Sequence, residues 1–154
     1  MLSDDAIRSR LQATIESLRY WVPTISDVAV VKEREQGSSW TLALAPKVDN
    51  ACPVELTLHP AQTFDLIVAD EEYDGRTASS FDLVLPLIEA VTEARVVQRR
   101  WISLATGAER AVETIITLAD GSTWRDGRTI EALADAIPRE AAERQDRHFL
   151  PYRR

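Results

Sequence analysis

The sequence predicts a single α+β domain, built mainly from antiparallel strands, with an N-terminal, a middle and a C-terminal helix packed on one side. Three observations predict this class. The 154 residues are the length of one ordinary domain. About six to seven short segments alternate between apolar and polar side chains, and the short turns between them favour antiparallel neighbours. Segments with a helical period stand before, between and after these strands.

The first helix is expected at about residues 3–20. Ser3 is a good N-cap, and Asp4 and Asp5 follow in the first turn, where the helix dipole favours negative charge. An apolar stripe with helical spacing then continues until Pro23 and comprises Ile7, Leu11, Ile15 and Leu18. We expect this stripe to pack on a sheet.

Four strands are predicted next: the first is rich in valine and ends in charge, and the other three alternate apolar side chains with smaller or polar ones. Their ranges are 27–33, 39–45, 54–59 and 64–69. One face of the resulting meander is strongly apolar and the other is small or polar, which suits a sheet covered on one side only.

An acidic loop is expected at 70–80, followed by the middle helix at 81–94. Pro86 is unfavourable inside a helix because it lacks an N–H donor and crowds the previous turn. We therefore expect the regular helix to begin near Leu85, with Pro86 in its first turn.

Residues 95–128 are predicted to form a three-stranded antiparallel meander with turns at 105–109 and 119–122. If Asp120-Gly121 is a two-residue hairpin turn, Thr117 lies opposite Trp124. A helix is expected from about 129 to 137, and 138–147 continues as a polar, helical stretch. Residues 1–147 form the expected globular body and 148–154 a C-terminal tail.

This meander has two different faces in the predicted registers, in which a symmetric loop at 105–109 places Trp101 opposite Glu113. The core face collects Ile102, Leu104, Val112, Ile116 and Leu118. The other face collects Val97, Arg99, Trp101, Glu113, Ile115, Thr117 and Trp124. Three alternatives remain for it: packing under the protein's own helices, an interface with a partner, or a small-ligand site. A register slip of one residue would exchange the two faces.

Composition excludes several classes of function. The net charge of −7 argues against non-specific nucleic-acid binding, because phosphates would meet no positive field. No apolar run approaches the roughly 20 residues that span a bilayer, and the N-terminus lacks a secretory signal, so we expect a cytoplasmic protein without a membrane partner. Cys52 is the only cysteine and is expected to be a partly buried, inert thiol.

Motifs for catalysis, metal binding or a cofactor are weak. The sequence has no nucleophile elbow, glycine-rich phosphate loop or zinc motif. A dyad of Cys52 and His59 lacks an accompanying oxyanion motif. The acids before Gly75 have the spacing of a calcium loop, but Phe81 stands where a bidentate glutamate is required. We expect no catalytic residue, metal or cofactor, and an enzyme is the less favoured class.

Three functions remain as hypotheses. The leading one is a non-catalytic binding or assembly module that binds itself or another protein through Arg99, Trp101, Glu113, Ile115 and Trp124. The alternative is a small-molecule binding protein or small enzyme that holds an anionic ligand on the same face, with Arg99, Arg100 or Arg125. The third is an acidic inhibitor or immunity-type protein that uses Asp70, Glu71, Glu72 and Asp74 against a basic partner.

Overall fold

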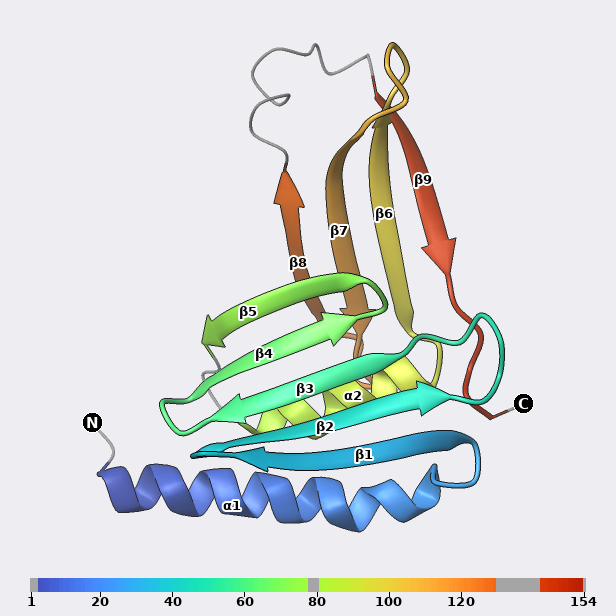
Figure 1. Cartoon of the computed structure of the whole chain (residues 1–154). Coiled ribbons are helices and arrows are strands. Elements are labelled where there is room, and N and C mark those ends of the chain that lie inside the picture. Colours follow the sequence, from blue (N-terminus) through green and yellow to red (C-terminus); the bar gives the residue numbers. More distant parts are fainter. Residues whose placement is uncertain (1–2, 78–80, 130–141, 154) are drawn as a thin grey trace.

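Two antiparallel sheets and two α-helices make up the computed structural model, which describes residues 3–77, 81–129 and 142–153 (Figure 1). The first sheet follows chain order, with strands β1 (Ala29–Gln36), β2 (Ser39–Pro46), β3 (Val54–His59), β4 (Thr63–Val68) and β5 (Glu71–Thr77). The second has the order β8 (Thr123–Thr129), β7 (Glu109–Thr117), β6 (Val96–Ser103) and β9 (Ala142–His148). The α+β class and the antiparallel sheets are therefore confirmed, although the strands are more numerous than predicted.

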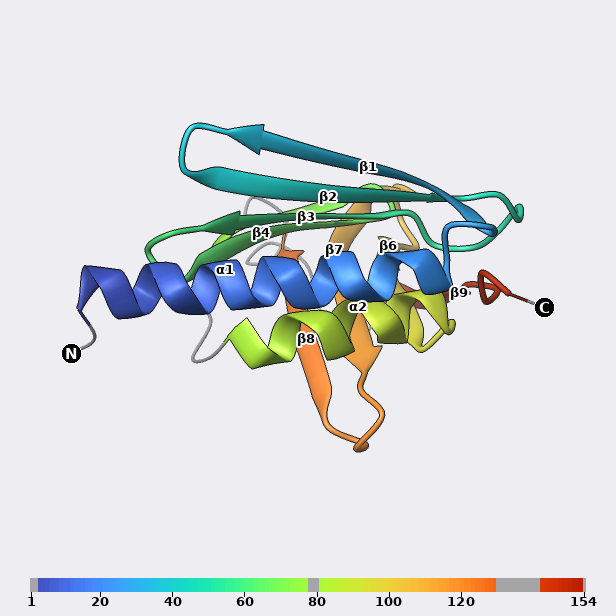
Figure 2. The same ribbon diagram turned by 90° about the horizontal axis from the view of Figure 1, so that it is seen from below.

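Helices α1 (Asp4–Trp21) and α2 (Val84–Thr92) lie side by side on one face of the first sheet (Figure 2). The Ser3 hydroxyl caps α1 by accepting the N–H of Ala6 at 3.2 Å. The buried residues of α1 are Leu11, Ile15 and Leu18. The predicted N-terminal helix and its inward stripe are confirmed.

Helix α2 begins at Val84, so Pro86 lies in its first turn, where a missing N–H costs no hydrogen bond. This late start agrees with the prediction. Short 3₁₀ turns, η1 (Val22–Thr24) and η2 (Phe81–Leu83), follow α1 and precede α2. The third predicted helix, at about 129–137, lies outside the described residues apart from Thr129, which ends β8.

The prediction of an acidic loop at 70–80 was wrong, because 71–77 is strand β5. Glu71 and Tyr73 are 5% and 2% exposed, while Glu72 and Asp74 face solvent. The alternation of a strand is present, but one of its two inward-facing side chains is a carboxylate. Because the carboxylate of Glu71 stands where an apolar side chain is expected, the sequence does not show the two-residue period of a strand.

The polar helix predicted at 138–147 was also wrong over its described part, where β9 pairs with β6 along seven residue pairs. Its sequence, AERQDRH, has good helix formers. The unpaired edge of β6 supplies a ladder of hydrogen bonds that overrides this local preference. An edge strand with charged side chains also resists pairing with other chains.

The C-terminal segment after β9 packs on the body of the protein. Phe149 and Tyr152 are buried, and the Tyr152 hydroxyl donates to the carbonyl of Cys52. The N–H of Leu150 donates to the carbonyl of Asn50 at 2.8 Å. This segment therefore closes one end of the core formed by the first sheet and both helices.

Candidate functional site

The register between β7 and β8 removes Trp124 from the predicted face. Trp124 pairs with Ile116, not with Thr117. The hairpin loop has three residues, 119–121. The N–H of Gly121 donates to the carbonyl of Leu118, and the N–H of Leu118 donates to the carbonyl of Ser122, which closes the loop. Gly121 has a φ of 88°, the left-handed conformation that closes such a loop. The loop is one residue longer than predicted, so every side chain of β8 lies on the face opposite to the predicted one.

Trp124 consequently lies between the two sheets. Its ring centroid is 5.5 Å from that of Tyr73, edge to face, and 6.5 Å from that of Phe64. It is partly buried and packs on the core.

Four of the five predicted site residues do share a face. Arg99 pairs with Glu113, two residues from the predicted partner, and a slide of two preserves the faces. We call this surface of the second sheet the outer face and define it by Arg99, Trp101, Glu113, Ile115, Arg125 and Asp146. The predicted core face on the other side is confirmed for Val112, Ile116 and Leu118, whereas Leu104 is 66% exposed in a turn.

Arginines on the outer face have loose partners. Arg99 and Asp146 are 3.7 Å apart, and Arg125 and Glu113 are 3.9 Å apart. The Nε of Arg99 is buried without a hydrogen-bond partner. Among the described residues, no hydrogen bond or ion pair links this face to an element outside the second sheet. Within the described residues, the outer face thus holds a buried donor, the Nε of Arg99, that has no hydrogen bond.

The opposite face of the second sheet docks on the first sheet through polar groups. Gln98 and Thr114 are fully buried: the Gln98 amide donates to the carbonyl of Val68 at 2.9 Å, and the Thr114 hydroxyl lies 2.5 Å from that of Tyr73. We call this contact the polar joint.

Ion pairs surround the polar joint. Arg128 donates to both oxygens of the buried Glu71 at 3.0 Å, and these hydrogen bonds hold the pKa of Arg128 above its usual value. Arg100 donates to Asp70 at 3.0 Å and to Glu109 at 2.9 Å. Arg100, a predicted anion holder, is thus already paired, and so are Asp70 and Glu71 of the predicted acidic surface. Only Glu72 and Asp74 of that group remain as exposed carboxylates on β5.

A second constellation lies on the open face of the first sheet, opposite the helices, and sequence reasoning missed it. The Oγ of Ser39 is 2.7 Å from Nδ1 of His59, and Nε2 of His59 is 2.7 Å from Oδ2 of Asp65. We call these three side chains the Ser–His–Asp chain. They come from β2, β3 and β4, so only the strand pairing brings them together.

The thiol considered as a partner for His59 lies elsewhere. Cys52 is fully buried before β3, whereas His59 ends that strand. Burial raises the pKa of Cys52 to about 12. The expectation of a buried thiol is confirmed, and a thiolate at neutral pH is unfavourable.

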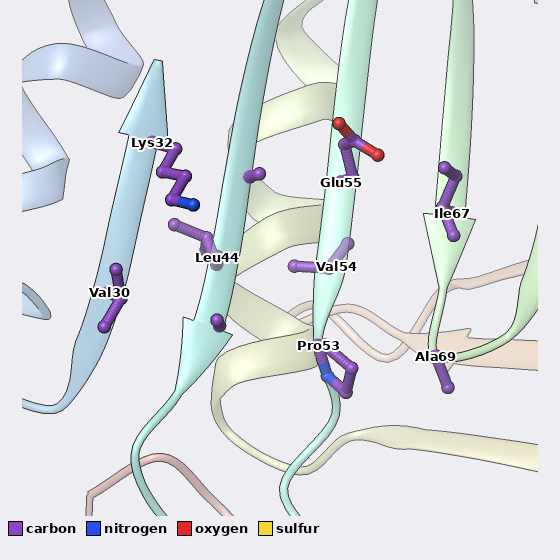
Figure 3. A pocket seen from close by; sticks show the side chains of 10 residues that line it. Val30, Lys32, Leu44, Pro53, Val54, Glu55, Ile67 and Ala69 are labelled. Atoms are coloured by element: carbon purple, nitrogen blue, oxygen red, sulfur yellow. The ribbon is translucent and has the colours of Figure 1, made fainter.

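The open face also has an apolar hollow of about 320 Å³ next to the far end of β3 (Figure 3). Its apolar lining includes Val30, Ala43, Ala45, Pro53, Ile67 and Ala69. Lys32 and Glu55 border it on the side toward the Ser–His–Asp chain. The face is thus polar at one end and apolar at the other.

In the part of the chain that the structure describes, no three His, Cys, Asp or Glu side chains are grouped as metal ligands require, and neither helix combines the length and apolarity needed to span a bilayer. Comparison with known protein families, with curated proteins and with solved structures found no match for this chain.

Proposed function

We propose that the protein is a binding module that self-associates through the outer face of the second sheet. The observation that carries the proposal is the buried Nε of Arg99, which has no hydrogen-bond partner and lies 3.7 Å from Oδ1 of Asp146, on a face that also presents the half-buried Trp101. Tryptophan and arginine are the residues most enriched at interface hot spots. A buried guanidinium nitrogen without a partner costs free energy until an acceptor arrives.

The signs of charge on the outer face favour a second copy as the partner. Arg99 and Arg125 lie on the same face as Glu113 and Asp146. In a twofold dimer each patch meets its own copy, so a surface with both signs can place arginines opposite carboxylates. The ion pairs Arg99–Asp146 and Arg125–Glu113 are long and partly exposed, so little free energy is lost when these arginines pair with carboxylates of the second copy instead.

Sedimentation velocity over a wide range of concentrations tests this proposal. We expect a concentration-dependent dimer, and we expect Trp101→Ala to weaken it about tenfold or more, as for an interface hot spot. Tyr20→Ala is the matched control, because Tyr20 is an aromatic residue on α1 that is 88% exposed. A protein that stays monomeric at every concentration would contradict self-association.

A small anionic ligand is the second candidate occupant, supported by the same Arg99 nitrogen. Calorimetric titration with inorganic phosphate distinguishes it. Binding that Arg99→Gln abolishes in a protein that remains monomeric would favour the ligand.

A further inference from the structure

The Ser–His–Asp chain is oriented from its acidic end. Oδ1 of Asp65 accepts the N–H of Gly75 at 2.7 Å, which leaves Oδ2 for the imidazole of His59. Although partial burial raises the pKa of Asp65, the hydrogen bonds from Gly75 and His59 outweigh it and lower that pKa below its usual value. Asp65 is therefore an ionised acceptor at neutral pH.

An ionised acceptor fixes the tautomer of the neutral imidazole. Because Asp65 can only accept, Nε2 of His59 must carry the proton. Nδ1 then has a free lone pair, and the Ser39 hydroxyl donates its proton to it across 2.7 Å. These are the roles of serine, base and carboxylate in a catalytic triad, with the two ring nitrogens exchanged.

The Ser–His–Asp chain is accessible to solvent. The side chains of His59 and Asp65 are 29% and 28% exposed, and both helices lie on the opposite face of the sheet (Figure 2). The neighbouring pair of Thr41 and Thr57, 2.9 Å apart, shows a cross-strand hydrogen bond without a base. Ser39 differs from that pair because its hydroxyl meets an imidazole positioned by a carboxylate.

We propose that Ser39 is a nucleophile for acyl transfer from activated esters, with His59 as its general base and Asp65 as the positioning residue. This activity is separate from the proposed self-association, since the two faces belong to different sheets. The proposal concerns activated esters because Ser39 and His59 supply a nucleophile and a base, and such substrates need little help at the carbonyl oxygen.

The apolar hollow gives the acyl group a place to lie. Ser39, Ala43 and Ala45 are on β2 with the same parity, so their side chains share the open face. Ala43 is roughly 13 Å from Ser39 at about 3.3 Å per residue, a distance that an acyl chain of roughly ten carbons spans. We therefore expect esters with a long apolar acyl chain to be preferred.

The reaction has two halves. Oγ of Ser39 forms a bond to the ester carbonyl carbon while Nδ1 of His59 takes the hydroxyl proton. The bond from that carbon to the leaving oxygen then breaks, and the alcohol departs with the proton from His59. Water next attacks the Ser39 ester with His59 as base, which releases the carboxylic acid and returns the proton to Oγ.

Release of p-nitrophenol from p-nitrophenyl acetate and decanoate tests the proposal. We expect Ser39→Ala and His59→Gln each to lower the rate by about 10²-fold, the low end of general-base effects. Ser38→Ala is the matched control, because Ser38 is the exposed serine next in sequence. Equal rates in wild type and Ser39→Ala would overturn the proposal, since His59 or the bulk surface would then be the reactive group.

Two measurements on correctly folded protein complete the test. A fluorophosphonate probe is expected to label the wild-type peptide that contains Ser39, and labelling of other residues only would contradict the proposal. Asp65→Asn is expected to move the His59 proton from Nε2 to Nδ1 in ¹⁵N NMR spectra, because an amide can donate to Nε2. An unchanged tautomer would remove the positioning role.

The hollow has its own test. Ala43→Asp, at the distance that a ten-carbon chain reaches, is expected to lower the ratio of decanoate release to acetate release. Equal effects on both esters would overturn the assignment of the hollow to the acyl chain.

Discussion

The two sheets of this protein are both antiparallel, but they bury different kinds of side chain. The inward face of the first sheet is apolar from β2 to β4 and lies under two helices. The docking face of the second sheet buries Gln98 and Thr114 completely. The difference follows from what each sheet packs against.

A helix presents a side-chain surface, whereas the end and edge of a sheet present backbone groups that need partners. The second sheet docks near the end of β4 and along β5, where the carbonyl of Val68 accepts from Gln98. A polar side chain is the appropriate core residue at such a position. Alternating side chains therefore predict a strand, but the element that the strand packs against determines whether its inward side chains are apolar or polar.

The largest expected effect concerns the apolar side of this comparison. Leu56→Ala creates a cavity under the first sheet, where Leu56 is fully buried, and should lower the free energy of unfolding by about 3 kcal/mol. Urea denaturation followed by circular dichroism and by Trp fluorescence measures it. Coincident transitions would show that both sheets unfold together, and separate transitions would break the picture of one shared core.

Loss of the positive charge of Arg128 beside the polar joint should destabilise the protein. Arg128→Met leaves the carboxylate of Glu71 buried without its bidentate partner and should lower the free energy of unfolding by about 2 kcal/mol, less than for a fully buried pair because Arg128 is 47% exposed. Arg125→Met, on the same strand but on the outer face, is the matched control and should change it by under about 0.5 kcal/mol. Equal losses would contradict the distinction between the two faces.

The smallest effect is acid sensitivity of the joint. Partial burial raises the pKa of Asp70, but the hydrogen bonds from Arg100 outweigh it, so that pKa is lower in the folded chain. A carboxyl of this kind stabilises the fold above its unfolded pKa of about 3.9, and the stability is lost as the pH falls through the folded value.

Asp70→Asn should therefore reduce the loss of stability between about pH 5 and pH 2. The side chain is 60% exposed, so the change should stay below about 1 kcal/mol. Thermal unfolding at several pH values measures it, with the exposed Asp74→Asn as control. An identical acid profile for wild type and Asp70→Asn would show that the pair with Arg100 contributes nothing to docking.

Sequence reasoning predicted the elements whose apolar period is strong: α1, α2 and strands β1 to β4. It missed β5 and β9 because their strand character comes from tertiary pairing and not from apolar side chains. It assigned Trp124 to the wrong face because the choice between a two-residue and a three-residue loop at Gly121 lies in backbone conformation. The Ser–His–Asp chain could not be predicted, since its members meet only through the registers of three strands.

The docked C-terminal segment has a consequence for how the chain folds. The hydrogen bond between Tyr152 and Cys52 joins residues 100 positions apart in sequence, and Arg153 pairs with Asp27 across 126 positions. Closing such large loops costs conformational entropy before any contact compensates it. The first sheet can form from hairpins between neighbouring strands. The core is complete only when the C-terminal segment makes these contacts with residues far away in the sequence. Folding of this domain should therefore be slow for its size.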